Sequence, residues 1–266
     1  MSTVTKHFDL AKLAWPDVAA LLARPGGCAA ILPVGATEAH GPHLPLDTDV
    51  TIALGTARRA AAELERRGRA CVVLPPIAYS VAQYAASFAG TLSLPSETAV
   101  ANLRDTLIAA ARAGFAPLAV ANAHLEPAHI ETIKQAAELA RAAGADVRFP
   151  DVTRRALAQR LTEEFRSGAC HAGRYEGSLV LADDPAAVKD EVRRALPAVP
   201  ISLVDAMRAG RTDFRAAGGE QAYFGAPAEA SAEEGRASFE VLAAMVVEAL
   251  LATAPLTGPG PAAQNA

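Results

Sequence analysis

Cysteine is scarce in this sequence and follows no pattern. The three cysteines, Cys28, Cys71 and Cys170, are widely spaced and form no C-x-x-C pair. An odd number of cysteines argues against a disulfide framework, which is typical of proteins in oxidising compartments. We therefore expect the chain to work in a reducing environment and to be cytoplasmic.

Blocks of basic residues and long apolar runs are absent as well. The 266 residues carry a formal net charge of −4, so nucleic acids and anionic membrane surfaces are not expected as partners. No uninterrupted apolar run reaches the roughly 18 residues of a membrane-spanning helix. The first residues, MSTVTKHFDLAKLAWPD, carry charges where a secretory signal peptide has its apolar stretch, which argues against export.

Short apolar runs alternate with segments of helical periodicity over the first two-thirds of the chain. Strands separated by helices of ten or more residues are typical of βαβ units, so we predict an α/β fold with a mostly parallel sheet flanked by helices. The expected strands are 28–34, 70–78, 116–123 and 145–152. The expected helices are 49–67, 127–143 and a third that is capped by Ser96 or Thr98 and ends at Gly114.

The last third of the sequence is less periodic. The segment 201–230 is rich in glycine and alanine, and we expect long loops there. A strong helical pattern follows at 233–252. We expect a single domain over 1–253 and a disordered tail of proline, glycine and alanine over 254–266.

Side chains that suit metal ions follow the first expected strand. Within the sequence EAHGPHLPLDTD the chain places Glu38, His40, His43, Asp47 and Asp49. The E-x-H spacing lets Glu38 and His40 point the same way in an extended segment, and the turn-rich stretch after them can fold an aspartate back. Carboxylates and imidazoles together suit Zn²⁺, Mn²⁺ or Fe²⁺. Spacing alone leaves Asp47 and Asp49 equally eligible.

A second cluster, NAHLE at 122–126, follows the third expected strand and places His124 two residues before Glu126. In parallel sheets, ligands bind in a crevice outside the carboxyl ends of the strands, so the loops after the first three strands should meet there. Two clusters of carboxylate and histidine at neighbouring strand ends predict a site for two metal ions with one bridging carboxylate.

A third polar stretch, CHAGRYEGS at 170–178, supplies further candidates. His171 could act as a proton shuttle, and Glu176 could pair with a group near the site or cap the helix that follows. A thiol nucleophile at Cys170 is not favoured, because adjacent residues seldom form a nucleophile and its base. His129 is expected to be an ordinary histidine on a helix face.

The stretches that hold these candidates resemble motifs of the creatininase (creatinine amidohydrolase) family. The resemblance begins with LAWPDV and LPVGATEAHGPHLPLDTD and continues through FAGTLSL, NAHLE, HAGRYEGS and GAPAEASAEEG. The motifs stand in the family's order and are spread over most of the chain, which makes the resemblance specific.

This resemblance implies a three-layer, Rossmann-like α/β amidohydrolase with two divalent metal ions per chain. The positions that match the family's metal ligands are Glu38, His40, Asp49, His124 and Glu126, with Asp49 as the bridge. The catalytic candidates are His171, which matches the family's proton-transfer histidine, and Glu126. His43 and Asn122 match positions around the ligands. Family members are commonly homohexamers, so a homohexamer is expected here.

The sequence departs from the family pattern near the expected site. Leu125 and Glu126 replace the glycine pair of the usual NGHGGN, and the resulting H-x-E form resembles that of creatininases proper. Tyr84, Arg174 and Glu176 are candidates for contacts with the substrate or the ligands. For Arg174, which stands where many relatives have glutamate, a surface salt bridge is the alternative.

The expected reaction is hydrolysis of a C–N bond in a small molecule, with a cyclic amide favoured by the H-x-E loop. A formamide, a peptide bond and a cyclic keto-sugar are the alternatives that the family resemblance leaves open. Phosphoester hydrolysis is not favoured, since the sequence shows no phosphate-cradling loop. A metal-binding scaffold without activity is the non-enzymatic alternative, but none of the five expected ligands is missing.

Overall fold

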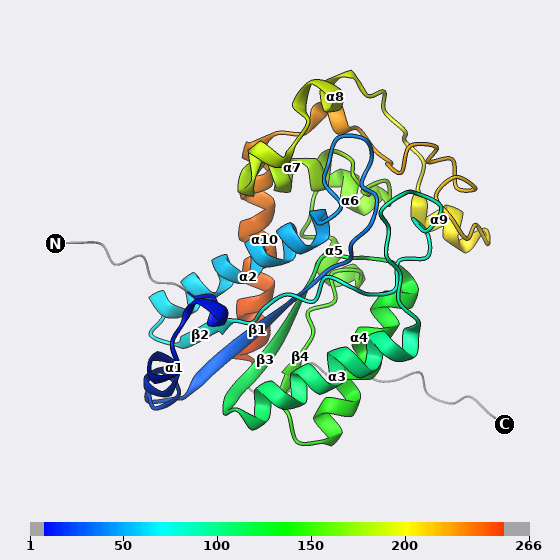
Figure 1. The fold of residues 1–266 in the computed structure, drawn as a ribbon. Helices are drawn as coiled ribbons and strands as arrows, with labels where there is room; N and C mark the ends of the chain where they lie inside the picture. The colour runs from blue at the N-terminus through cyan, green and yellow to red at the C-terminus, as the bar shows by residue number, and fades with distance from the viewer. Residues whose placement is uncertain (1–7, 253–266) are drawn as a thin grey trace.

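The centre of the molecule is a four-stranded sheet in the order β2-β1-β3-β4, in which every neighbouring pair is parallel. The computed structural model describes residues 8–252. Its strands are β1 (Cys28–Val34), β2 (Ala70–Val73), β3 (Phe115–Asn122) and β4 (Val147–Arg148). The predicted α/β fold, a parallel sheet flanked by helices in a single domain, is confirmed (Figure 1).

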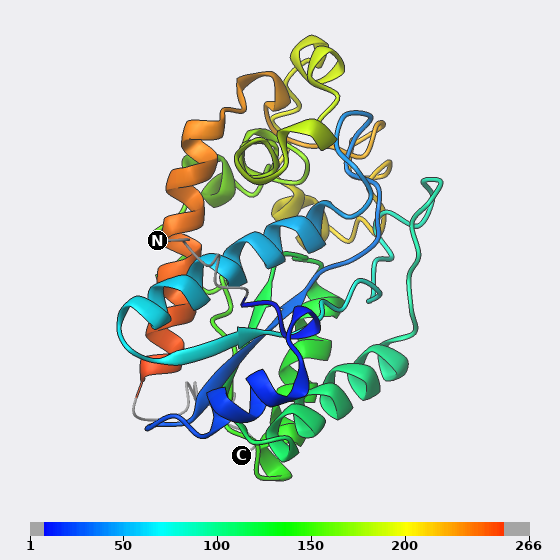
Figure 2. The same cartoon turned by 60° about the vertical axis from the view of Figure 1, so that its left-hand side comes forward.

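Helices cover both faces of this sheet and complete three layers (Figure 2). The covering helices are α2 (Thr48–Arg66), α3 (Ser96–Arg112), α4 (Pro127–Ala142) and α10 (Ala232–Leu251). Ala30 and Leu32 of β1 pack with α3 and α4, whereas Ala29 and Ile31 pack with α2 and α10. Because strand side chains alternate between the two faces, a strand covered on both sides must be apolar throughout, as β1 is.

The remaining helices are short, and α6, α7, α8 and α9 gather beyond the carboxyl end of the sheet (Figure 1). They are η1 (Leu10–Lys12), α1 (Trp15–Leu22), α5 (Arg155–Ala158), α6 (Glu163–Ser167), α7 (Arg174–Asp183), η2 (Pro185–Ala187), α8 (Asp190–Ala195), α9 (Leu203–Arg208) and η3 (Pro227–Glu229). Within residues 8–252, no helix combines the length and the apolar character needed to cross a membrane.

Two strands are shorter than predicted. The expected strand 70–78 ends at Val73, because Pro75 and Pro76 have no N–H to donate to a neighbouring strand. Beyond them, Ile77 forms only an isolated bridge with Val34. Only 147–148 of the expected strand 145–152 is paired, and Pro150 follows closely.

The helices also differ in detail from the expectations. Neither Ser96 nor Thr98 caps α3, which begins at Ser96 itself after Pro95 and has no side-chain cap. The segment 201–230 contains α9 and η3 and is not loop alone. Ser231 caps α10 by accepting a hydrogen bond from the Glu234 N–H. The tail expected over 254–266 lies outside the described residues.

The packing of α10 on α7 depends on Gly235. A Cβ atom at this position would collide with the Ser178 carbonyl of α7. We expect Gly235→Ala to lower the free energy of unfolding by about 1–3 kcal/mol, because the two helices must move apart. Gly177→Ala is the matched control, since its Cβ would meet only the Ala230 Cβ at 3.1 Å. Urea denaturation measures both variants, and equal stability of Gly235→Ala and the parent would contradict this packing.

Candidate metal centre

The polar clusters meet beyond the carboxyl ends of β1 and β3. These two strands are neighbours, and the chain continues from β1 to β2 on one side and from β3 to β4 on the other. Ligands bind at such a reversal of strand order in open α/β sheets. Gly35 lets the start of α2 approach the loop after β1, because a Cβ at Gly35 would lie 2.7 Å from the Asp49 Cβ.

Three overlapping groups of potential metal ligands gather here, each with its ligand atoms within 4.8 Å of one another, and two of the three share Asp49. The group without Asp49 is Glu38, His40 and His171. Glu38, Asp49 and His124 form the first of the two that share it. His124 Nδ1 lies 3.0 Å from Glu38 Oε1 and 3.1 Å from Asp49 Oδ2. Its other nitrogen, Nε2, donates to the Val81 carbonyl at 2.8 Å, since a carbonyl can only accept. This bond orients the ring and turns Nδ1 towards the carboxylates, as in metal-binding histidines.

His40, Asp49 and Glu176 form the second group, under the same distance limit. His40 Nε2 lies 3.2 Å from Asp49 Oδ1 and 3.5 Å from Glu176 Oε2. Its Nδ1 donates to the Glu38 carbonyl at 3.1 Å, so Nε2 is the nitrogen left for a ligand. Asp49 therefore belongs to both groups and turns one carboxylate oxygen towards each, which is the arrangement of a bridging ligand.

The charges of this cluster are buried, because Glu38, Asp49 and Glu176 are each less than 5% exposed. Burial alone would raise the pKa of Asp49, but His40 and His124 lower it well below its usual range. Burial alone would lower the pKa of His40, but the carboxylates raise it to about 10. Glu38 Oε2 and His40 Nε2 have no hydrogen-bond partner among the described residues. Buried carboxylates need compensating positive charge, so the two groups fit divalent cations.

Glu126 lies outside both groups, although the sequence predicted it as a ligand and Glu176 as a neighbour of the ligands. Glu126 Oε2 accepts a hydrogen bond from the Tyr84 N–H at 3.2 Å and lies 4.0 Å from His124 Nε2. Burial raises the pKa of the Glu126 carboxyl to about 6. Glu176 therefore faces the cluster directly, whereas Glu126 lies beside it and lines the same cavity. The ligand role and the catalytic role expected for Glu126 both stay predictions.

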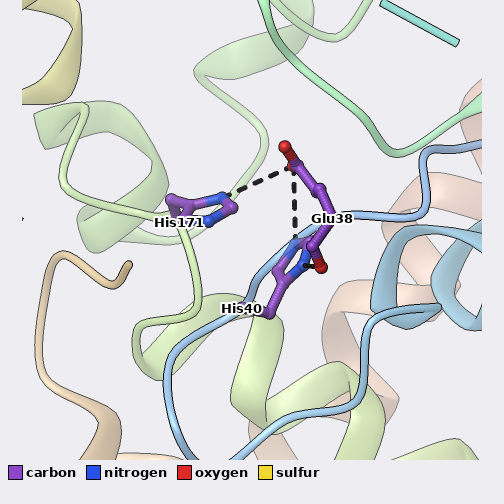
Figure 3. Close-up of side chains that lie close together, drawn as sticks. All are labelled: Glu38, His40 and His171. Carbon is purple, nitrogen blue, oxygen red and sulfur yellow. Dashed lines mark hydrogen bonds and ion pairs between the residues drawn. The ribbon is translucent and has the colours of Figure 1, made fainter. Parts of the chain in front are cut away.

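His171 approaches the cluster from the loop before α7. Its Nε2 donates to the Ala39 carbonyl at 3.0 Å, and its Nδ1 lies 4.0 Å from Glu38 Oε1. Figure 3 shows the Glu38 carboxylate facing the rings of both His40 and His171. Burial and the neighbouring His40 lower the pKa of His171 to about 4, so Nδ1 offers a free lone pair. The ring also packs against Phe214, with 4.4 Å between centroids.

The Asn122 side chain holds the backbone of His124 in place. The Asn122 side chain donates to the His124 carbonyl at 2.6 Å and accepts from the His124 N–H at 3.3 Å. The Asn122 Oδ1 also accepts from His129 Nε2 at 2.9 Å, and the His129 ring packs on His124 with 4.8 Å between centroids. His129 is therefore part of this support, which the sequence analysis missed. The sequence did hold a signal for this role: His129 stands beside the apolar Ile130 and near Ile133 in α4, which indicates a buried histidine.

The other candidates lie farther from the cluster. His43 is buried, with its ring edge-on to Tyr223 at 6.2 Å. Arg174 forms salt bridges of 3.2 Å with Glu229 and with Glu234 and does not line the cavity beside the cluster. The structure shows the salt bridges that were the alternative for Arg174, and a contact with substrate stays a prediction. Burial raises the pKa of the Cys170 thiol well above its usual range, in line with the argument against a cysteine nucleophile.

A cavity of about 430 Å³ opens over the cluster. Its floor includes Glu38, Asp49, His124, Glu126, His171 and Glu176. Its walls come from Tyr84 and Phe214 and from the segments 165–168 and 202–208 at α6 and α9. These walls are mixed, since apolar side chains such as Leu203 and Met207 alternate with polar ones such as Arg166 and Arg208.

The family model described as creatinine amidohydrolase matches residues 11–250. The chain belongs to the creatininase family. A mycofactocin precursor peptide peptidase of Mycobacterium ulcerans (strain Agy99) is 33% identical over 239 residues, covering 87% of this chain and 86% of the relative. A creatinine amidohydrolase of Pseudomonas putida is 32% identical over 128 residues, covering 46% of this chain and 47% of the relative.

Solved structures of the family share the fold. A crystal structure of creatinine amidohydrolase (creatininase) superimposes with a TM-score of 0.69 at 28% identity, covering 92% of this chain and 97% of that chain. This creatininase-family hydrolase thus combines the family's fold with a buried cluster that can hold a divalent metal. The resemblance stated from the sequence is confirmed.

Proposed function

We propose that this creatininase-family protein hydrolyses a C–N bond with two divalent metal ions held by Glu38, His40, Asp49, His124 and Glu176. The observation that carries the proposal is the pair of ligand groups that share Asp49. Each group combines carboxylate and imidazole, a donor set that suits zinc, manganese or iron. Compared with the ligands expected from the sequence, Glu176 takes the place of Glu126.

Two side chains that line the cavity, Glu126 and His171, can transfer protons during the reaction. Two such cations, when bound, would lower the pKa of a water and polarise the substrate carbonyl. Glu126, with its raised pKa and its place on the cavity floor, accepts a proton from the attacking water and passes it to the leaving nitrogen. His171 can assist this transfer through Nδ1, its one nitrogen without a carbonyl partner.

We propose a peptide as the substrate class and a small cyclic amide as the second candidate. The relative named as a mycofactocin precursor peptide peptidase matches most of the chain, whereas the creatinine amidohydrolase matches less than half of it. The cavity supports the first choice, since about 430 Å³ lies within the range of sites for ligands much larger than a single small ring. The H-x-E sequence at His124 and Glu126 favours the second.

Metal content and turnover, measured on the same preparation, test this proposal. Protein purified without chelator should contain about two divalent ions per chain by elemental analysis, and it should cleave a mycofactocin precursor peptide, as followed by mass spectrometry. Hydrolysis of creatinine, without cleavage of the peptide, would identify a small cyclic amide as the substrate class. Removal of the ions by a chelator should abolish turnover, and zinc or manganese should restore it.

Folded protein that binds no divalent metal after reconstitution would contradict the proposed chemistry. The homohexamer and the cytoplasmic location expected from the sequence stay predictions. Light scattering on the metal-loaded protein measures the first of them.

A further inference from the structure

Glu164 is a buried carboxylate that lies outside both ligand groups. It belongs to α6 and is 9% exposed. Its Oε1 accepts a hydrogen bond from the Tyr175 N–H at 2.8 Å, and its Oε2 accepts one from the Ala226 N–H at 2.8 Å. The first N–H groups of a helix lack partners within the helix, and no side chain at Gly173 caps α7. Glu164, a residue of α6, therefore supplies a hydrogen-bond acceptor for a backbone N–H in the first turn of α7.

Two glycines let the chain close around this carboxylate. A Cβ at Gly173 or at Gly225 would collide with the Glu164 carboxylate. Gly225 also has a φ of +88°, in the region that side chains other than glycine rarely adopt. The segments at 173 and 225 and helix α6 thus meet at one side chain.

The segment that Glu164 holds carries two residues of the cluster. His171 and Glu176 stand on either side of Gly173, and the Phe224 N–H donates to the His171 carbonyl at 2.8 Å. Between them, Ala172 has a φ of +50°, and its N–H donates to Glu176 Oε2 at 2.6 Å. A left-handed alanine is a costly conformation that the surrounding contacts must maintain.

We propose that Glu164 is a positioning residue, which places His171 against Glu38 and Glu176 against Asp49 by holding the start of α7 and the segment at Ala226 together. This inference rests on the proposed metal centre, because Glu176 is there a ligand of one ion. An ionised carboxylate accepts at both oxygens and donates at neither. Glutamine has nearly the same size but turns an NH₂ group towards one of the two N–H donors.

The test compares Glu164→Gln with Asp151→Asn in the full-length protein. Asp151 is also buried and accepts a hydrogen bond from a backbone N–H, that of Thr153 at 3.0 Å, but it does not line the cavity. Hydrogen exchange on the metal-free proteins should be faster over 171–177 in Glu164→Gln only. Titration with Co²⁺, followed by visible absorption, should show one of two ions bound about 10–100-fold more weakly in Glu164→Gln, with both affinities kept in Asp151→Asn.

A Glu164→Gln protein with lowered stability, unchanged exchange over 171–177 and two unchanged Co²⁺ affinities would overturn the proposal, leaving Glu164 a purely stabilising role. Glu164→Asp keeps the charge with a shorter reach and should weaken the same ion to a smaller extent, so it carries the test if Glu164→Gln does not fold. Wild-type protein that binds two Co²⁺ ions but hydrolyses no amide would contradict the proposed function alone. If wild type binds no Co²⁺, the exchange comparison still decides whether Glu164 holds the segment.

Discussion

Glu176→Gln is expected to reduce the metal content from about two ions to about one per chain and to suppress hydrolysis. The amide keeps the shape of the side chain but loses the charge that faces His40 Nε2 at 3.5 Å. Replacing residues around metal ligands typically costs about 10–100-fold in affinity or activity, so loss of a ligand should cost at least that much. Elemental analysis and turnover of the same preparation measure both effects.

Glu229→Gln is the matched control for this variant. Glu229 is exposed and pairs with Arg174, the first residue of the helix that carries Glu176. The control should keep both ions and full turnover. Two tightly bound ions in Glu176→Gln would exclude Glu176 as a ligand.

Glu126→Gln is expected to keep both metal ions and to lose most of its turnover. The Glu126 carboxylate is held by the Tyr84 N–H beside His124 but outside both ligand groups. Glutamine cannot accept and return a proton, and loss of general acid–base catalysis typically lowers kcat about 10²–10⁴-fold. KM should change much less, because the cavity keeps its shape.

Glu131→Gln serves as the control. Glu131 is an exposed residue of α4, the helix that begins directly after Glu126, and this variant should behave like wild type. Loss of one ion in Glu126→Gln would restore the ligand role that the sequence resemblance implied. An unchanged kcat with both ions bound would remove Glu126 from the chemistry.

The central part of the fold could be predicted from the sequence. The apolar run of β1 is continuous because both faces of the strand are covered, and the alternation of strands with long helices indicated a parallel sheet. Strand ends were less predictable. Apolar character continues through Leu74 and Ile77, but the prolines between them stop the pairing. In the segment 201–230, short helices are held by tertiary contacts and leave little periodic signal in the sequence.

For the candidate site, too, one part could be predicted from the spacing of residues and another could not. Glu38, His40 and Asp49 lie close in the chain, and His124 follows the neighbouring strand, so local spacing and the geometry of parallel sheets were sufficient to bring them together. The bridging position of Asp49 came from the family resemblance, since spacing left Asp47 equally eligible. In the structure, Asp49 is in the first turn of α2 and belongs to both groups, whereas Asp47 precedes the helix.

The sequence by itself determined the chemistry of this site: the residue types, their order and the strand ends at which they cluster. Only the tertiary structure decided which glutamate joins the cluster. Glu126 precedes α4 and has a non-helical backbone, which sends its carboxylate to the Tyr84 N–H. Glu176 lies in the first turn of α7, where helical side chains tilt towards the N-terminus and so towards His40. That direction depends on where α7 is anchored, and contacts distant in sequence, such as those of Glu164, set it.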